Sequence, residues 1–436
     1  MNVTLSCGRN EVGLSVPDDS IVYRLRYPES EASAEGLVLA ALRSPLGRPA
    51  LWEAVRGRAD GDVVVVVSDV TRPVPYPTFL RAMLEEIESA GVQHDQILIL
   101  IATGLHRPAT KEEERLILGE DVADAYRVAS HDARDEATLV ELPGKTWAGA
   151  RVRLDRRYVE AGYRIITGLV EPHFMAGFSG GRKAVCPGLS CLETIRRFHG
   201  EPFLSDPLSR NGVLEGNPLH MEALSVARIA GVDFSLNVVM DSQRRVVHAF
   251  SGELEQAHEA ACRLARHCAC PTVREEADAV LTSCGGYPLD ETFYQCVKGF
   301  VSCIPAVRCG GAVLSFGGCG EGIGSREYGQ LMRDYAGRWR EFLEEIKGPA
   351  SFVRDQWELQ MHARALEKVG EENLHFFTPG LEQADLDRLS VNGHAVAAEA
   401  LASAVQEALD GLFADGARLA VIPDGPYCAP LPPAGA

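Results

Sequence analysis

Largely apolar runs recur along this chain, and more polar segments separate them. Such runs cover residues 63–67, 97–102, 163–167 and 234–240, and the first consists of valines alone. β-Branched residues favour strands, and runs this apolar are typical of strands that are buried on both faces of a parallel sheet. We therefore predict four buried strands in this part of the chain.

A helical period lies between the first two runs. Within residues 78–90, Phe79, Met83, Leu84 and Ile87 fall on one face of a helix. The alternation of strand, turn and helix predicts an α/β fold in which a mainly parallel sheet is flanked by helices.

The strand pattern starts again in the second half of the chain. Residues 277–283 and 312–316 predict further buried strands, and the alanine-rich segment 395–409 predicts a long helix. We therefore expect two α/β domains, an N-terminal one over residues 1–272 and a smaller C-terminal one over residues 275–410. A last strand is predicted at 418–422, and we expect residues 413–428 to cross back and complete the N-terminal domain.

Charge and composition narrow the class of protein. The chain of 436 residues carries a formal net charge of −18, which argues against a nucleic-acid or anionic-membrane partner, since either would require a basic face. The apolar runs are too short to span a bilayer, and no secretory signal pattern begins the chain, so we expect a cytoplasmic protein. The twelve cysteines are scattered without a CxxC pair, which predicts reduced, buried thiols rather than a zinc site.

Residues with useful chemistry follow two of the predicted strands. Asp69 and Arg72 follow the first strand, and His106 follows the second. Asp69 could accept hydrogen bonds from ligand hydroxyls, and Arg72 could bind a carboxylate through two hydrogen bonds. His106 could serve in acid–base catalysis. The structural alternatives are a capping aspartate, a surface ion pair and a histidine that hydrogen bonds within its loop.

The segment 171–191 follows the third strand and combines several kinds of chemistry. His173 comes directly after a proline, which favours extended or turn geometry. Arg182 and Lys183 offer a planar fork and a flexible amine to a phosphate group. Three glycines before them allow a tight loop whose N–H groups could converge on an anion: Gly177, Gly180 and Gly181.

Further candidates lie later in the chain. His199 follows a short predicted helix and could bind a metal only with ligands from elsewhere, for which a cofactor is a legitimate source. In the second domain, helical spacing groups Tyr294, Gln295 and Lys298, and the last two could hold a small anion. The alternatives are a solvated helix face there and simple packing for Trp357.

Taken in order over residues 60–360, these motifs resemble the nickel-pincer lactate racemase family. The resemblance is carried by Asp-Val-Thr-Arg-Pro at 69–73, Thr-Gly-Leu-His-Arg-Pro at 103–108, Glu-Pro-His through Gly-Gly-Arg-Lys at 171–183, His199, Tyr-Pro-Leu-Asp at 287–290, Tyr-Gln-Cys-Val-Lys-Gly at 294–299, and Trp357.

The resemblance implies a specific cofactor. In this family a nickel-pincer nucleotide, Ni(II) pyridinium-3,5-bisthiocarboxylic acid mononucleotide, is attached covalently to a lysine, here Lys183. A histidine, here His199, completes the coordination of nickel. The implied cofactor-binding residues are Lys183, Asp69, Val70, Thr71, Arg72, Gly177, Ser179, Gly180, Gly181 and Trp357.

The same resemblance implies an isomerase, a racemase or epimerase of a lactate-like 2-hydroxy acid. Hydride transfer from Cα to the cofactor would give a 2-keto acid, and His106 and His173 would exchange the hydroxyl proton, one on each face. The active site would lie in a cleft between the two domains. Its substrate-binding residues would be Arg72, Tyr294, Gln295 and Lys298.

Other readings remain open at this point. Malate, an aromatic 2-hydroxy acid or a sugar acid are alternative substrates, and Arg107, Arg182 and Arg326 are candidate cations for a second acidic group. An enzyme that uses Lys183 as a Schiff base is a further alternative, and so is a non-catalytic nickel-cofactor-binding protein. Cofactor-biosynthesis proteins are the implied protein partners.

Overall fold

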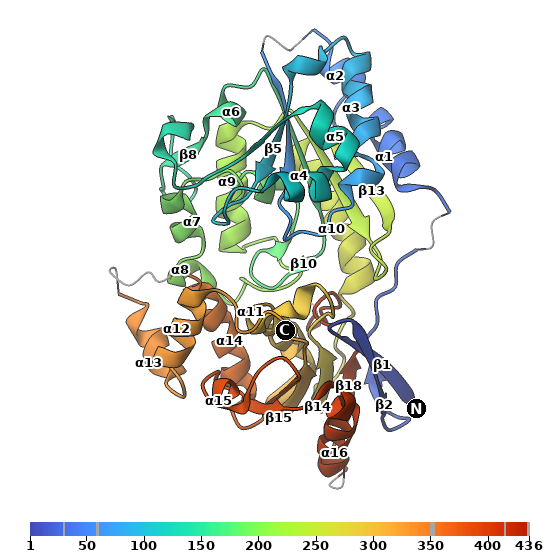
Figure 1. The fold of residues 1–436 in the computed structure, drawn as a ribbon, viewed down its shortest axis with the longest axis vertical. Coiled ribbons are helices and arrows are strands. Elements are labelled where there is room, and N and C mark those ends of the chain that lie inside the picture. The colour runs from blue at the N-terminus through green and yellow to red at the C-terminus, as the bar shows by residue number, and fades with distance from the viewer. Residues whose placement is uncertain (29–30, 58–60, 349–353, 414–415, 434–436) are drawn as a thin grey trace. The chain divides into compact units, whose positions relative to one another are not determined.

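The computed structural model describes residues 1–436 except 29–30, 58–60, 349–353, 414–415 and 434–436. The chain forms two compact units. The first unit comprises Tyr27–His199 and Leu208–His267, and the second comprises Met1–Arg26, Gly200–Pro207 and Cys268–Ala436. Both are α/β units with mainly parallel sheets flanked by helices, which confirms the predicted fold class (Figure 1).

The sheet of the first unit has six strands in the order β13-β12-β9-β4-β5-β6. Neighbouring strands are parallel except β12 and β13, which are antiparallel. The bounds are β4 Val63–Ser68, β5 Ile97–Ala102, β6 Arg127–Ser130, β9 Tyr163–Leu169, β12 Phe234–Met240 and β13 Val246–Gly252. Four of these are the strands predicted from apolar runs, and every valine of β4 is fully buried.

Helices cover this sheet because their apolar faces match its buried side chains. Helix α3 (Leu80–Ser89) buries Leu80, Met83, Leu84 and Ile87 as the predicted face requires. The predicted helix starts two residues too early, since 78–79 lie in a short 3-10 turn and the cap that precede α3. The other helices are α1 Ala34–Arg43, α2 Leu51–Val55, α4 Lys111–Leu118, α5 Glu120–Ala125, α6 Arg156–Val159, α7 Leu192–Phe198, α9 Pro218–Ala230 and α10 Leu254–Ala269.

Two small hairpins complete the described part of the first unit. Strands β7 (Leu139–Leu142) and β8 (Val152–Asp155) form one of them. Strands β10 (Pro172–His173) and β11 (Gly177–Phe178) form the other, which follows β9 directly.

The second unit contains a fully parallel sheet of six strands in the order β17-β16-β15-β14-β18-β3. The bounds are β3 Ile21–Val22, β14 Ala277–Ser283, β15 Val307–Phe316, β16 Leu374–Thr378, β17 Asn392–Ala395 and β18 Leu419–Ile422. A hairpin of β1 (Asn2–Cys7) and β2 (Asn10–Ser15) packs its alternate apolar residues into the same core.

The helices of the second unit connect and flank these strands. Helix α14 packs against α11 and β15. The bounds are α8 Glu201–Leu204, α11 Phe293–Cys303, α12 Arg326–Asp334, α13 Trp339–Glu345, α14 Gln356–Val369, α15 Gln383–Leu386 and α16 Leu401–Phe413.

Three expectations from the sequence are wrong. Residues 1–26 and 200–207, which were expected in the N-terminal domain, belong to the second unit, where β3 pairs with β18. The segment 413–428, of which 414–415 lie outside the described residues, does not complete the N-terminal domain, because β18 pairs with β14 and β3 of the second unit. Its Leu419 and Val421 join the apolar core of that unit. The helix expected over 395–409 starts at Leu401, since 392–395 form strand β17 beside β16.

The burial of the cysteines agrees with the prediction of buried thiols. None of the twelve cysteines, all of which lie in the described part of the chain, forms a disulfide bond, and all but Cys309 are buried. Among the described residues, no helix is long and apolar enough to cross a membrane.

Candidate active site

Three neighbouring strands of the first unit deliver the predicted site residues to one edge of its sheet. Strands β9, β4 and β5 are adjacent and parallel, so their carboxyl ends lie at the same edge. Asp69 follows β4, His106 lies four residues after β5, and His173 lies four residues after β9. The sheet order therefore brings together groups that are distant in sequence.

Asp69 and His106 form a direct pair. Oδ2 of Asp69 lies 2.5 Å from Nδ1 of His106, and Oδ1 accepts a hydrogen bond of 2.7 Å from the Thr71 hydroxyl. Burial alone would raise the pKa of Asp69, but the hydrogen bonds from His106 and Thr71 and the charge of Arg72 lower it below its usual value. An ionised carboxylate only accepts, so Nδ1 of His106 carries the proton and Nε2 holds the lone pair.

His173 has the opposite arrangement. It lies in the β10–β11 hairpin, where the backbone N–H groups of Met175 and Ala176 each lie 3.2 Å from its Nδ1. Because both groups are donors, Nδ1 accepts, and the proton of the neutral ring is on Nε2. The two histidines therefore differ in which nitrogen is protonated.

His199 caps the C-terminus of α7 and is held as a neutral ring. Its Nδ1 donates to the carbonyl oxygen of Ile195 at 3.2 Å, which leaves the lone pair on Nε2. Burial is the main cause that lowers its pKa to about 3, and the positive charges of Lys183 and Arg72 lower it further. These charges place His199 among the cationic groups of the site.

The glycine loop before Lys183 is shaped mainly by contacts within the protein. Gly177 and Gly181 have φ angles of 78° and 52°. A Cβ on Gly177 would lie 1.9 Å from the Val213 carbonyl oxygen, and one on Gly181 would lie 2.5 Å from the His258 ring. The Gly181 N–H donates to Asn237 at 2.9 Å. The tight loop predicted here is present, but close packing accounts for these two glycines, and this N–H is not directed at an anion.

Ser179 is also engaged inside the protein. Its hydroxyl donates to the carbonyl oxygen of Leu169 at 2.7 Å, and its oxygen accepts from the Glu171 N–H at 3.0 Å. Lys183 follows in a short 3-10 turn, Gly181–Ala184, and is half-buried. The backbone of Lys183 is therefore held by this turn, while its side chain is partly exposed.

Arg182 does not serve as the expected phosphate fork. Only 1% of the residue is exposed. Its guanidinium donates to the Ala176 carbonyl oxygen and to Nε2 of His258, both at 2.8 Å. Burial lowers its pKa to about 10. Arg182 instead fastens the loop to the interior.

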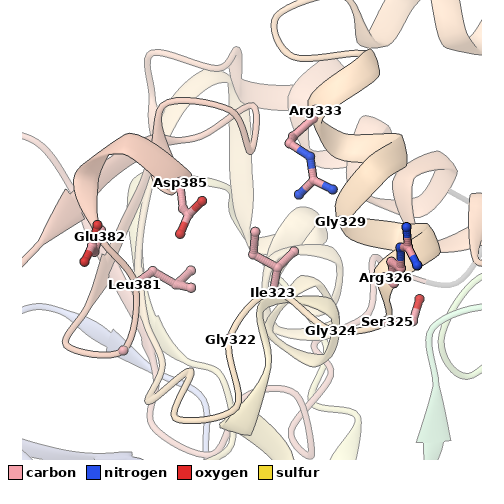
Figure 2. A pocket seen from close by; sticks show the side chains of 11 residues that line it. Gly322, Ile323, Gly324, Ser325, Arg326, Gly329, Arg333, Leu381, Glu382 and Asp385 are labelled. Carbon is pink, nitrogen blue, oxygen red and sulfur yellow. The ribbon is translucent and has the colours of Figure 1, made fainter.

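Arg107 and Arg326 also have definite positions. Arg107 is exposed and forms two hydrogen bonds of 2.7 Å with the carboxylate of Glu113. Arg326 lines a pocket of about 480 Å³ in the second unit. Figure 2 shows the guanidinium groups of Arg326 and Arg333 at this pocket. The acidic side chains of Glu382 and Asp385 also line it.

Helix α11 carries three of the four substrate-binding residues that the family resemblance implies. Tyr294, Gln295 and Lys298 are half-buried and belong to its first two turns, which begin after the capping residue Thr292. The indole N–H of Trp357 donates to the Tyr294 hydroxyl at 2.8 Å, so Trp357 is linked to this group. The sequence did not indicate two features of these groups. They are the pairing of Asp69 with His106 and the burial of the Glu358 side chain.

Metal binding by protein side chains alone has no support in the described part of the chain, where no group of three His, Cys, Asp or Glu residues is arranged around a common point. This includes the histidine and cysteines at 267–270. His199 likewise belongs to no such group among the described residues.

Known proteins resemble this chain over nearly its full length. Residues 7–212 match the family model for the lactate racemase N-terminal domain, and residues 272–427 match that for the C-terminal domain. The chain is 34% identical over 371 residues to a lactate racemase of Thermoanaerobacterium thermosaccharolyticum, which covers 84% of this chain and 86% of the relative. It is 32% identical over 402 residues to a lactate racemase of Lactiplantibacillus plantarum, with 91% of each covered.

A solved structure is similar too. The lactate racemase apoprotein from Thermoanaerobacterium thermosaccharolyticum superposes with a TM-score of 0.87 and 31% sequence identity, covering 99% of this chain and 100% of the other.

Proposed function

The chain belongs to the lactate racemase family and is an isomerase, and from that premise we propose that it racemises a 2-hydroxy acid, with lactate as the first substrate to test. The Cα–H bond of such an acid is not acidic enough for a histidine to break. We propose a transient 2-keto acid, because its planar carbonyl can be reduced from either face.

We propose that the cofactor is the nickel-pincer nucleotide, attached to Lys183 and bound through nickel by Nε2 of His199. The donor atom supports this assignment, because the neutral ring donates its Nδ1 proton to Ile195 and keeps the Nε2 lone pair. The cations around it suit a nucleotide phosphate. When bound, this group would supply an acceptor and donor of hydride for the substrate Cα. Cofactor-biosynthesis proteins would supply it.

The two histidines would handle the hydroxyl proton. His106 has its Nδ1 proton held by Asp69, so Nε2 can take the hydroxyl proton from one enantiomer. In its neutral form His173 can donate a hydrogen bond from Nε2–H to the oxygen on the other face. To return the hydroxyl proton it must first take up a proton from solvent, and His106 must pass the proton that it has taken back to solvent. The opposite protonation of these two rings is the observation that best supports a two-sided reaction.

The remaining residues would bind and orient the substrate and the cofactor. We propose that Arg72, Gln295 and Lys298 bind the substrate carboxylate, and that Tyr294 assists them, so that only the reacting carbon changes geometry. The other cofactor contacts stay as proposed from the family resemblance. They are Val70, Thr71, Gly177, Ser179, Gly180, Gly181 and Trp357, whereas Asp69 takes the added part of orienting His106.

The test combines mass spectrometry with a chiral assay. Protein purified with its cofactor should carry a sulfur-rich adduct on Lys183 and should racemise a 2-hydroxy acid in a panel of lactate, malate, phenyllactate and gluconate. An aldehyde adduct that borohydride reduces would instead support Schiff-base chemistry. An adduct without turnover on any member of the panel would support a cofactor-binding protein.

A further inference from the structure

A fully buried histidine lies directly after strand β6 of the first unit. The side chains of His131 and Asp155 both have no solvent exposure, and Nδ1 of His131 lies 3.1 Å from Oδ2 of Asp155. The other ring nitrogen, Nε2, lies 3.0 Å from the carbonyl oxygen of Ser190. Both ring nitrogens therefore face oxygen atoms at hydrogen-bonding distance.

The carboxyl group of Asp155 is ionised. Its Oδ1 accepts hydrogen bonds from the backbone N–H and the Nε–H of Arg157 at 3.0 and 2.9 Å, and the Arg157 guanidinium also donates to Oδ2 at 2.6 Å. Burial alone would raise the pKa of Asp155, but the hydrogen bonds from Arg157 and His131 lower it below its usual value. Asp155 therefore accepts hydrogen bonds and has no proton to donate.

These two acceptors decide how His131 is protonated. A neutral imidazole has one nitrogen without a proton, and the lone pair of that nitrogen would face an oxygen at 3.0 or 3.1 Å. Only the doubly protonated ring satisfies both contacts, and a buried charge is stable when it is paired. Arg157, the other cation at Asp155, keeps 32% of its side chain exposed, so water weakens the repulsion between the two cations.

The Ser190 carbonyl group belongs to the segment that follows Lys183. Within this segment the Gly188 N–H donates to the Lys183 carbonyl oxygen at 3.1 Å. The N–H of Asp155 donates to the Leu189 carbonyl oxygen at 3.1 Å. The buried histidine and its carboxylate partner therefore bind two successive carbonyl groups of the chain just after the proposed attachment site.

The same histidine is hydrogen bonded to the loop that carries His106. The Thr103 hydroxyl donates to the His131 carbonyl oxygen at 2.8 Å, and the His106 N–H donates to the Thr103 carbonyl oxygen at 3.0 Å. In that loop the Gly104 N–H also donates to the Gly188 carbonyl oxygen at 3.0 Å. Hydrogen bonds therefore connect His131 both to the loop of a proposed acid–base histidine and to the segment after the attachment lysine.

From these contacts we propose that His131 is a positioning residue, a buried imidazolium that fixes the backbone after Lys183 relative to the loop of His106. The inference rests on the proposed function, because it takes Lys183 as the attachment site of the cofactor and His106 as an acid–base group. His131 acts only through the backbone groups that it binds.

The charge of His131 can be measured in cofactor-free protein labelled with ¹⁵N-histidine. The ring signals that disappear in His131→Gln should be those of an imidazolium, with both nitrogens protonated at pH 7. Asp155→Asn removes the negative charge with little change in shape, so the ring should be neutral in that variant. A neutral tautomer in the wild type would overturn the proposal.

The positioning role is tested through the amine of Lys183 in the same cofactor-free protein. Acetylation by an N-hydroxysuccinimide ester, followed by peptide mass spectrometry, measures the access to this amine. His131→Leu loses the bond to Ser190, so Lys183 should react roughly 2- to 10-fold faster, the range that one hydrogen bond of ordinary net strength implies. His131→Gln can still donate to Ser190 and should have an intermediate rate. The exposed Lys145 should react equally in all variants.

Two matched controls separate position from stability. His94 has the same pattern of contacts at the surface, since its ring nitrogens lie 2.7 Å from a Glu88 carboxylate oxygen and 2.8 Å from the Ala125 carbonyl oxygen. Tyr158→Phe removes a buried hydrogen bond of 2.7 Å to the Gly231 carbonyl oxygen in the same unit. Neither His94→Gln nor Tyr158→Phe should change the acetylation rate of the attachment lysine.

In cofactor-loaded protein a displaced backbone should slow the reaction rather than weaken substrate binding. His131→Leu should therefore lower kcat roughly 10- to 100-fold, with a smaller change in KM. Circular dichroism of each variant excludes misfolding as the cause. Should His131→Leu not fold, the comparison of His131→Gln with the wild type decides in the same way.

The outcomes are distinct. If cofactor-loaded wild-type protein racemises no 2-hydroxy acid, the proposed function fails, while the ring signals and the acetylation rates still decide the role of His131. If the wild type is active but His131→Leu keeps the wild-type kcat or the wild-type reactivity of Lys183, the positioning role is overturned. An equal rise of this reactivity in Tyr158→Phe would also overturn it, because general destabilisation would then explain the effect.

Discussion

Asp69 and His106 lie 37 residues apart in sequence, and their side chains meet at 2.5 Å. This contact fixes the imidazole tautomer and its orientation. Asp69 therefore has a second role, the orientation of His106, in addition to the cofactor contact that the family resemblance implies. It also makes the pair a target for a substitution that changes hydrogen bonding with little change in shape.

We expect Asp69→Asn to lower kcat/KM by roughly 10²- to 10⁴-fold, because the amide can donate to Nδ1 and favour the wrong tautomer of His106. Two enantiomers have the same free energy, so kcat/KM must fall equally in both directions. Chiral chromatography from each enantiomer measures this. Asp132→Asn, in the loop after β6, is the control, and an unchanged rate in Asp69→Asn would refute the orienting role.

His106→Ala and His173→Ala should each abolish racemisation while nickel stays bound. Each variant lacks one group for proton exchange, yet neither is a proposed metal ligand. Metal analysis and a chiral assay on the same sample test this. Loss of nickel from both variants would show that the histidines serve the cofactor rather than the substrate.

His199→Ala should lose nickel, because no other protein ligand is proposed for it. Elemental analysis of the purified variant measures the loss. Lys183→Ala is the companion variant and should lack the covalent adduct in the intact mass. Nickel retained at the wild-type ratio in His199→Ala would contradict the ligand assignment.

Arg182→Met should reduce the free energy of unfolding by about 2–3 kcal/mol, since it removes buried hydrogen bonds to Ala176 and His258. Denaturant titration gives the value. Arg107→Met removes an exposed pair with Glu113 and should change stability little. Equal effects of both substitutions would mean that Arg182 does not fasten the loop.

Stability should fall with pH in the acid range partly because of His362. It is fully buried, and burial lowers its pKa to about 3 from an ordinary value of 6.5. Between these values the unfolded chain binds a proton that the folded chain does not, so the free energy of unfolding decreases as pH falls. Denaturant titrations at pH 7 and pH 5 should show a smaller decrease for His362→Gln. His248→Gln, at an exposed histidine, should keep the wild-type decrease.

The sequence predicted these strands well because nearly all of their side chains are apolar, as in β4 and β5. It misplaced β18, because a short apolar strand fits either sheet and only its neighbours β14 and β3 decide the pairing. The same limit applies to β17, where four residues pair with β16 although alanines follow them.

The candidate site was predictable as a set of strand ends but not as a network of contacts. Sheet order brings Asp69 to His106, and no local pattern contains that order. Arg182 illustrates a further limit, since an arginine beside glycines suggests phosphate binding while its burial depends on the position of His258. The sequence contained no sign that Glu358 is buried, because its burial depends on how α14 packs against other elements.

Arg182 and Lys183 are adjacent cations with opposite surroundings, one enclosed and one partly open to solvent. Their order along the chain is therefore not interchangeable. A single-residue deletion between Gly177 and Lys183 would shift Lys183 toward the enclosed place of Arg182 and bring a different residue to the proposed place of attachment. We expect natural selection to remove insertions and deletions within residues 177–183, even where individual substitutions are tolerated. A redesign of the protein should keep the length of this stretch unchanged.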